Sequence, residues 1–394
     1  MSAKSSARFA SPFLLLVGLL LIGANLRAPI TGVGPVLELM RHALDLGTAA
    51  AGALTTLPLL AFAVASPFCV LLAREYGLER SLFAALVLIA AGVALRSLGP
   101  VWALFVGTGI IGVGIAIANV LLPSLLKRDF PERIATLTSA YALTAGVVAA
   151  VASGVAVPIA TLPGSGWNWA LGAVVVVPLV ALAVWMPQLS NHSAPVAGTA
   201  TPPHGGRVWH SMLAWQVTGF FGLNSLVYYV TVTWLPSILT DAGYSAAMAG
   251  SFHGVSQLAT AVPGLFLGPV VNRLKDQKVI SVGVVSVTAI ALLGLLLLPG
   301  WALVWAALFG FGTGSTFILG LAFISLRAID VRQSAALSGM AQSVGYLVAA
   351  AAPPLVGLLH DLSGGWSAPL MICVAVCCAM MAFGYRAGRA VQIS

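Results

Sequence analysis

Arg27 is the residue whose chemistry stands out first, because it lies inside an apolar stretch that is long enough to cross a membrane. An arginine at the centre of a transmembrane helix is disfavoured by about 2.5 to 3.5 kcal/mol on insertion scales, so such residues usually face a cavity or a partner. The planar guanidinium offers five donors that match a carboxylate or another small planar anion. We therefore predict that Arg27 recognises an anionic substrate. The alternative is that Arg27 only ties together backbone carbonyls at helix ends.

The residues around Arg27 support a site at this point. Thr31 shares its helix face at a spacing of four residues, and Asn25 lies nearby. Gly32 and Pro35 weaken regular helix just beyond them, so a bend would open space around the guanidinium.

Two later apolar stretches carry polar side chains at the same helical spacing. Asn224 and Tyr228 belong to a stripe in residues 211–238, and His253 and Gln257 belong to another in residues 246–271. A histidine with a pKa near 6.5 could carry a coupled proton, although a neutral, hydrogen-bonded histidine fits the pattern equally well. Trp234 lies close to a span end, where it indicates an aromatic belt. The remaining candidates for the substrate site are Tyr229, Asn119, Tyr141, Gln342 and Tyr346.

The bland alternatives apply to these candidates as well. A tyrosine in a helical bundle often packs in the core with its hydroxyl satisfied. An amide in a membrane helix often serves only to hold helices together.

The composition places these residues in a membrane protein. Of 394 residues, 60% are hydrophobic and only 7% are charged, whereas about a quarter of a soluble chain is charged. The apolar runs are continuous, which favours helices over a barrel. We predict an all-α integral membrane protein with twelve spans. They cover residues 12–37, 48–73, 81–98, 100–126, 135–161, 167–187, 211–238, 246–271, 279–298, 300–327, 334–359 and 366–387.

The basic residues indicate the topology. Apart from Arg27 inside the first span, all but Arg41 and Arg96 fall in alternate loops or in the terminal segments, which predicts that both termini are cytoplasmic. The net charge of +8 is therefore a topology signal and does not indicate nucleic acid. We expect a monomer in a bacterial-type inner membrane.

The chain also divides in two. A polar stretch at residues 188–210 separates six spans from six, and the pair Gly112 and Gly114 is answered by Gly312 and Gly314 at an offset near 200 residues. We predict an N-terminal half of residues 1–187, a cytoplasmic linker of 188–210 and a C-terminal half of 211–394, related by pseudo-symmetry. Two such halves are typical of a secondary transporter with its site between them.

The loop after the second span contains Arg74, Gly77 and Arg80, and its counterpart after the eighth span contains Arg273. Both resemble the short cytoplasmic Gly/Asp/Arg loop of the major facilitator superfamily. The resemblance implies that the loops lock one access state. The alternative is that their charges report topology alone.

Carboxylates are absent from the middle of every predicted span, which argues against proton-coupled export of cations. No phosphate-binding loop accompanies the many glycines, so ATP-driven transport is disfavoured. We expect no enzyme activity, cofactor or metal.

Several motifs resemble the cyanate and 2-nitroimidazole transporter (CynX/NimT) family of the major facilitator superfamily. They include Asn25-Leu-Arg27, the segment from Gly114 to Pro123, Trp234-Leu-Pro236, and the segment from Gly339 to Tyr346. The resemblance implies a twelve-helix secondary transporter that moves a small planar anion or a nitroheterocycle by alternating access. A multidrug-type exporter of neutral heterocycles, in which Arg27 is structural, remains the alternative. Direction and coupling stay open.

Overall fold

The structure is a computed structural model that describes residues 12–130, 133–190, 206–329 and 331–393. Within these residues all regular structure is helical. Ten helical stretches are long and apolar enough to cross a membrane, and many of their large apolar side chains are exposed. A soluble protein rarely leaves such a surface open to water. The chain is therefore a multi-pass membrane protein, as predicted.

The helices that precede the polar stretch form the first group. The first span is divided into α1, α2 and α3, and the sixth into α8 and α9. The bounds are α1 Pro12–Asn25, α2 Ala28–Thr31, α3 Val33–Leu44, α4 Thr48–Tyr76, α5 Leu78–Arg96, α6 Val101–Asp129, α7 Ile134–Ala160, α8 Trp167–Ala173 and α9 Val176–Trp185.

The helices that follow form the second group. Most of the predicted linker, residues 191–205, lies outside the described residues. The bounds are α10 Gly206–His210, α11 Met212–Asp241, α12 Ala246–Ala259, α13 Leu267–Arg273, α14 Lys278–Leu297, α15 Ala302–Arg327, α16 Val331–Ser363 and α17 Ser367–Ala387.

The two predicted spans that fall outside the ten apolar stretches are the seventh and the eighth. α11 fills the seventh position as one helix of 30 residues. The eighth is α12, a 3₁₀ turn at Val262–Leu265, and α13. Polar side chains that the sequence singled out lower the hydropathy of α11, whereas the eighth passage is divided, so that α12 alone has only 14 residues. The helix positions are thus consistent with twelve passages.

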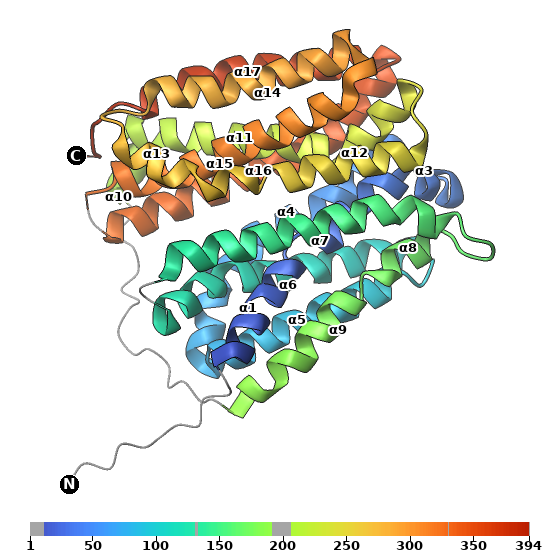
Figure 1. Ribbon diagram of the computed structural model, residues 1–394, viewed down its shortest axis with the longest axis horizontal. Helices are drawn as coiled ribbons and strands as arrows, with labels where there is room; N and C mark the ends of the chain where they lie inside the picture. The colour runs from blue at the N-terminus through green and yellow to red at the C-terminus, as the bar shows by residue number, and fades with distance from the viewer. Residues whose placement is uncertain (1–11, 131–132, 191–205, 330, 394) are drawn as a thin grey trace.

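Figure 1 shows the two groups as two layers, with α1–α9 in one and α10–α17 in the other. They meet where α4 packs on α16, α7 on α12, and α3 on α11. Glycine makes the α7 contact close, because a Cβ atom at Gly254 would lie 2.7 Å from the carbonyl oxygen of Ala150.

Close glycine contacts repeat in the two groups, two residues away from the register that the sequence suggested. By its contacts, Gly310 in the second group corresponds to Gly112 in the first, and Gly312 corresponds to Gly114. In each group one glycine approaches the helix of the second or eighth span, and the other approaches the third or ninth. The contacts are Gly112 with Pro58, Gly310 with Ser256, Gly114 with Ile89, and Gly312 with Thr288.

Two residues assigned to the membrane boundary are buried instead. Arg96 is 1% exposed and donates from Nη1 to the carbonyl oxygen of Pro29 at 2.5 Å. Trp234 is fully buried and donates from Nε1 to the carbonyl oxygen of Pro353 at 2.9 Å. The burial of Arg96 and Trp234 could not be predicted from their positions near span ends, because a helix end can still lie inside a bundle.

Candidate functional site

Arg27 lies where two interrupted helices meet, one from each group. It separates α1 from α2, and Pro29 cannot donate a backbone hydrogen bond to continue the helix. Thr260 directly follows the end of α12. Arg27 Nη1 donates to Thr260 Oγ1 at 2.5 Å, while that hydroxyl donates to the carbonyl oxygen of Gln257 at 2.7 Å. Interrupted helices that meet in this way form the binding sites of many transporters.

Tyrosines surround the half-buried guanidinium. The Arg27 Cζ atom lies 5.9 Å from the ring centroid of Tyr228, and Tyr228 meets Tyr229 edge to face at 5.1 Å. Arg27 also interacts electrostatically with the phenol groups of Tyr141, Tyr229 and Tyr346. These four residues come from α7, α11 and α16, and all were predicted from the sequence. The arrangement combines one cation with several aromatic faces.

Tyr346 extends this aromatic wall. Its ring lies 5.8 Å from Phe62 of α4 and 6.1 Å from Phe221 of α11, in both cases edge to face. Such geometry places the positive ring edge on a neighbouring π face. The wall therefore spans both groups of helices.

A hydrogen-bond chain crosses the boundary between the groups beside Arg27. Tyr228 Oη donates to Gln257 Oε1 at 2.8 Å, and Gln257 Nε2 lies 3.2 Å from His253 Nε2. His253 Nδ1 lies 2.8 Å from Ser153 Oγ, which donates to the carbonyl oxygen of Thr31 at 3.1 Å.

The direction of the chain fixes the state of the histidine. Because the Gln257 carbonyl oxygen accepts from Tyr228, its amide donates to His253 Nε2. The imidazole proton then lies on Nδ1 and is donated to Ser153. His253 is fully buried. Ser153 was missed by sequence reasoning, since a serine in a run of small residues carries no signal of its own.

Thr31, Asn25 and Asn224 are buried next to this region and make local contacts. The Thr31 hydroxyl donates to the carbonyl oxygen of Arg27, and Asn25 donates to that of Leu21. The Oδ1 atoms of Asn25 and Asn224 have no hydrogen-bond partner among the described residues. Thr31 thus supports the backbone of the break, while the two amides keep acceptor capacity.

Asn119 and Gln342 do not take part in the hydrogen-bond chain that runs from Tyr228 to Ser153. Asn119 of α6 is exposed, and it forms no hydrogen bond to the Arg27 cluster in the described part of the protein. Gln342 donates to Ser338 within α16 at 2.8 Å. Neither residue is drawn into the contacts around Arg27.

The loop after α4 turns at Gly77, whose φ of 83° favours glycine. Arg80 and Arg273 are exposed, and the side chain of Arg74 lies outside the described part. The buried acid of this loop is Glu79, which accepts from Arg128 at 2.7 Å. Sequence reasoning looked for an aspartate and overlooked it.

The contacts of Arg128 and Arg327 are similar. Hydrogen bonds from Arg128 to Asp129 and Glu79, opposed by burial, raise the pKa of its guanidinium above the ordinary value. At the corresponding place in the second group, Arg327 donates to the amide oxygen of Gln277. An ion pair in one group thus has a neutral counterpart in the other.

The opposite end of the bundle, which we call the Arg41 end, carries a polar network between the groups. Arg41 pairs with Glu38 at 2.9 Å and donates to Thr48 at 2.9 Å. Ser237 donates to Glu38 at 3.3 Å, and Thr48 hydrogen-bonds Asp361. These contacts join α3 and α4 to α11 and α16.

Acidic side chains keep away from Arg27. Apart from Glu38 within α3, the described carboxylates lie near helix ends or in loops, and Arg27 forms no ion pair with any of them. No group of three metal-ligand side chains occurs among the described residues. Within the described protein Arg27 therefore contacts neutral groups and has no counter-charge. Such a site is suited to an anion.

The fold and this site together define a membrane transporter for a small molecule, and the sequence comparisons agree. The Major Facilitator Superfamily profile matches residues 13–353. The chain therefore belongs to the major facilitator superfamily and, within it, to the family of cyanate and 2-nitroimidazole transporters.

Two curated relatives carry this assignment. The chain is 51% identical over 393 residues to the 2-nitroimidazole transporter of Escherichia coli, covering 100% of both chains. It is 30% identical to the cyanate transport protein CynX of the same organism, covering 89% of this chain and 91% of that protein. The fold is similar to that of a D-xylose-proton symporter, with a TM-score of 0.76 at 15% identity over 97% of this chain and 98% of the other.

Proposed function

We propose that this protein is a secondary transporter that moves a small planar anion, or a small nitroheterocycle, with Arg27 in its central site. The observation that carries the proposal is the surroundings of Arg27. Its guanidinium donates to the neutral hydroxyl of Thr260, faces Tyr228, and has no carboxylate partner among the described residues. A guanidinium in such a site keeps donors for a planar oxyanion.

The aromatic groups account for the second substrate class. Tyr228, Tyr229 and Tyr346 offer ring faces and edges next to the cation, and a flat heterocycle packs well on such surfaces. A nitro group resembles a carboxylate in shape and carries partial negative charge on its oxygens, so Arg27 can receive it. The names of the two relatives, a 2-nitroimidazole transporter and a cyanate transport protein, support both classes.

We assign the work of transport to alternating access between the two six-helix halves, residues 1–187 and 211–394. The hydrogen bonds recorded between the groups lie beside Arg27 or toward the Arg41 end, such as those from Thr233 to Thr55 and from Thr56 to Ala350. This pattern supports a state closed at the Arg41 end. Loops Arg74–Arg80 and near Arg273 would lock the other end in the alternate state.

The orientation follows from charge. We place the Arg41 end outside the inner membrane and both termini in the cytoplasm, since the remaining basic residues gather on the terminal side. The protein would act as a monomer.

Coupling to protons would involve His253. Protonation of Nε2 would set two donors against each other, at His253 and at the amide of Gln257, and would break the chain at that point, while Nδ1 would still donate to Ser153. Uptake by a proton-coupled protein should change steeply with pH, and His253→Gln should flatten that dependence. Uptake that is independent of pH in the unaltered protein would dispose of this role.

A second candidate function is export of neutral heterocycles with Arg27 as a structural residue. The bond between Arg27 and Thr260 favours it, because this bond ties two interrupted helices together without any substrate. The two functions differ in what the loss of the charge does.

The deciding experiment is binding and uptake by purified protein in liposomes, with cyanate, benzoate and 2-nitroimidazole as probes. Arg27→Gln should abolish uptake of the two anions, and Arg27→Lys should retain part of it. Arg386→Gln, at an exposed arginine, serves as the matched control. Equal affinity for the anions in all variants would overturn the anion site, and retained uptake of 2-nitroimidazole in Arg27→Gln would favour the second function.

A further inference from the structure

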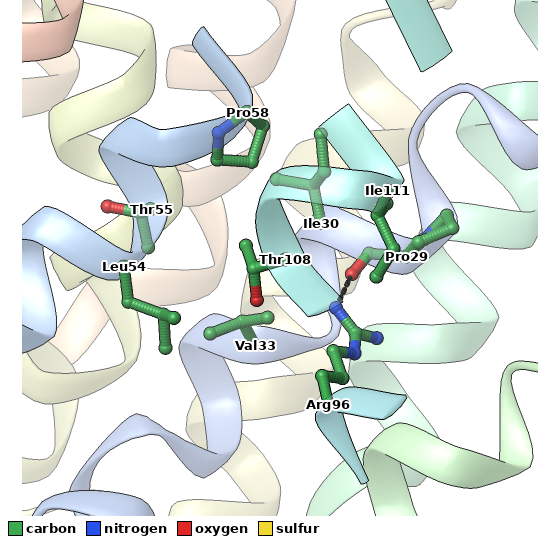
Figure 2. A pocket seen from close by; sticks show the side chains of 9 residues that line it. All are labelled: Pro29, Ile30, Val33, Leu54, Thr55, Pro58, Arg96, Thr108 and Ile111. Atoms are coloured by element: carbon green, nitrogen blue, oxygen red, sulfur yellow. Dashed lines mark hydrogen bonds between the residues drawn. The ribbon is translucent and has the colours of Figure 1, made fainter. Parts of the chain in front are cut away.

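Arg96 is a buried cation on the far side of the break in the first span. It ends α5, is 1% exposed, and donates from Nη1 to the carbonyl oxygen of Pro29 at 2.5 Å (Figure 2). Its Nε and Nη2 atoms have no hydrogen-bond partner among the described residues, and no described carboxylate pairs with it. A buried charge held in this way does not favour folding over an apolar side chain of similar volume. The role of Arg96 is therefore better explained by the backbone carbonyl to which it donates.

The carbonyl that Arg96 holds belongs to α2, the four-residue helix that directly follows Arg27. Backbone bonding along this helix is uneven, since the N–H groups of Ile30 and Thr31 donate to the carbonyl oxygen of Arg27 at 2.9 and 3.0 Å. Pro29 has no N–H, and Gly32 N reaches the carbonyl oxygen of Ala28 only at 3.4 Å. The bonds from Ile30 and Thr31 couple α2 to the backbone of Arg27, so a shift of α2 would move Arg27 with it.

Packing leaves α2 room on the side of Arg96. A cavity of about 10 Å³, about the space of one water, lies between α2, α4 and α6. Figure 2 shows the dashed bond from Arg96 to Pro29 at its edge, with Thr55 and Thr108 on the other walls. Two bonds from neighbouring helices hold this short helix beside the cavity: Arg96 donates to the carbonyl oxygen of Pro29, and Ser153 donates to that of Thr31.

The base of Arg96 is rigid. α5 and α6 approach so closely that a Cβ atom at Gly107 would lie 2.5 Å from the backbone nitrogen of Arg96. At Gly92, one turn earlier, an added Cβ would lie 2.7 Å from the carbonyl oxygen of Gly107. A charge-assisted bond from such a platform is strong and directional.

We propose that Arg96 is a positioning residue for Arg27. By holding the carbonyl of Pro29 it fixes α2, and so it sets the direction in which Arg27 reaches Thr260 and Tyr228. The inference rests on the proposed function only for the identity of what Arg27 binds, because the direction of Arg27 can be measured without any substrate.

Arg327 supplies a matched control. It is also buried, at 4% exposure, and it donates from Nε to the carbonyl oxygen of Ala387 at 2.8 Å, at the far end of the second group. Arg327→Met removes a similar bond without touching the first span. A loss of stability alone should therefore look the same in Arg327→Met and Arg96→Met.

The first measurement is the Kd for benzoate and 2-nitroimidazole, together with the Tm, on purified protein. Arg96→Met should weaken binding about tenfold or more, because a guanidinium misplaced by a fraction of an ångström loses its geometry. Arg96→Lys keeps one charged donor and should recover most of the affinity. Arg327→Met should bind as the unaltered protein does. Should Arg96→Met fail to fold, Arg96→Lys and Arg96→Gln carry the same comparison.

The second measurement needs no substrate. In protein whose four native cysteines are replaced by alanine, Arg27→Cys introduces a thiol whose rate of modification by a charged methanethiosulfonate reports its surroundings. Adding Arg96→Met should change that rate, whereas adding Arg327→Met should not. An unchanged rate together with an unchanged Kd overturns the positioning role. A changed rate with no binding of either probe upholds it and counts against the proposed function instead.

Discussion

Arg27 and Thr260 join the two groups of helices by one hydrogen bond of 2.5 Å in which a charged donor meets a neutral acceptor. The Thr260 hydroxyl donates its own proton to the carbonyl oxygen of Gln257. The bond is therefore a place-holder that a stronger acceptor can displace. An anion that enters the site competes with Thr260 for the same Nη1 atom.

Removal of the Thr260 hydroxyl should separate binding from stability. In Thr260→Val the Arg27 donor is free, so we expect a lower Tm without ligand and a several-fold lower Kd for benzoate. A hydrogen bond to a charged group contributes about 1.5 to 3 kcal/mol, which sets the upper limit of both effects. Thermal unfolding and titration of the same sample measure them.

Thr288→Val is the control for this variant, because Thr288 is also fully buried but bonds only within its own helix. It should change the Tm and leave the Kd alone. Weaker anion binding in Thr260→Val would show that the hydroxyl serves the ligand rather than competing with it.

The close approach of α7 and α12 should be sensitive to a single methyl group. Gly254→Ala would place a Cβ atom 2.7 Å from the carbonyl oxygen of Ala150, and overpacking of this kind is destabilising by about 1 to 3 kcal/mol. The separation also strains the bond between Ser153 and His253. We expect a lower Tm and slower uptake.

Gly154→Ala provides the comparison on α7, since nothing lies within 4 Å of a Cβ atom added there. It should match the unaltered protein in both measurements. Equal effects at the two positions would mean that helix propensity, and not the contact between groups, is responsible.

The buried ion pair of Glu79 and Arg128 should matter more than its loop suggests. The Glu79 side chain is only 5% exposed, so Glu79→Ala leaves a guanidinium without its buried partner. Arg128 keeps Asp129 and is 29% exposed, which limits the loss to about 1 to 2 kcal/mol. Glu79→Gln, which still offers an acceptor, should be milder.

Thermal unfolding in detergent measures these differences, and Glu75→Gln, at an exposed acid of the same loop, is the control. Identical midpoints for Glu79→Ala and Glu75→Gln would contradict a structural role for the pair.

The network at the Arg41 end should lose the stabilisation from Asp361 only at low pH. Partial burial disfavours the Asp361 carboxylate, but hydrogen bonds from Thr48 and His360 outweigh it and lower its pKa below the ordinary value of 3.8. The stabilisation is therefore fully present above about pH 4 and is lost as the pH falls through the lowered pKa.

Comparison with Asp361→Asn tests this. The difference in Tm between the two proteins should be constant from pH 7 to about pH 5 and should shrink below about pH 4. A difference that already vanishes near neutral pH would contradict a lowered pKa of Asp361.

The sequence predicted the spans well, because continuous apolar runs and alternate basic loops are strong signals. It also singled out Tyr228, His253 and Gln257, which the structure joins in one hydrogen-bond chain. A polar stripe at helical spacing in a membrane span is expected to face the interior. The predicted twelve-span register extends through α11 and α12, which carry polar side chains and are not among the ten apolar stretches.

What sequence could not reach depends on contacts between distant segments. Ser153 bonds His253 across 100 residues, and Arg96 bonds Pro29 across 67. A serine among small residues and an arginine at a span end both have ordinary local explanations. Only the packing of α7 on α12, and of α5 behind α2, gives them a specific task.

The pairing of Glu79 with Arg128, where the second group has Gln277 with Arg327, makes the two repeats respond differently to their surroundings. The Arg128 side chain is 29% exposed, so mobile ions screen part of its attraction to the buried Glu79 carboxylate, whereas the amide of Gln277 carries no net charge to screen. We therefore expect that a rise in ionic strength on that side of the membrane weakens the contact between Glu79 and Arg128. The contact between Gln277 and Arg327 should stay nearly unchanged, so the two groups of helices would respond differently.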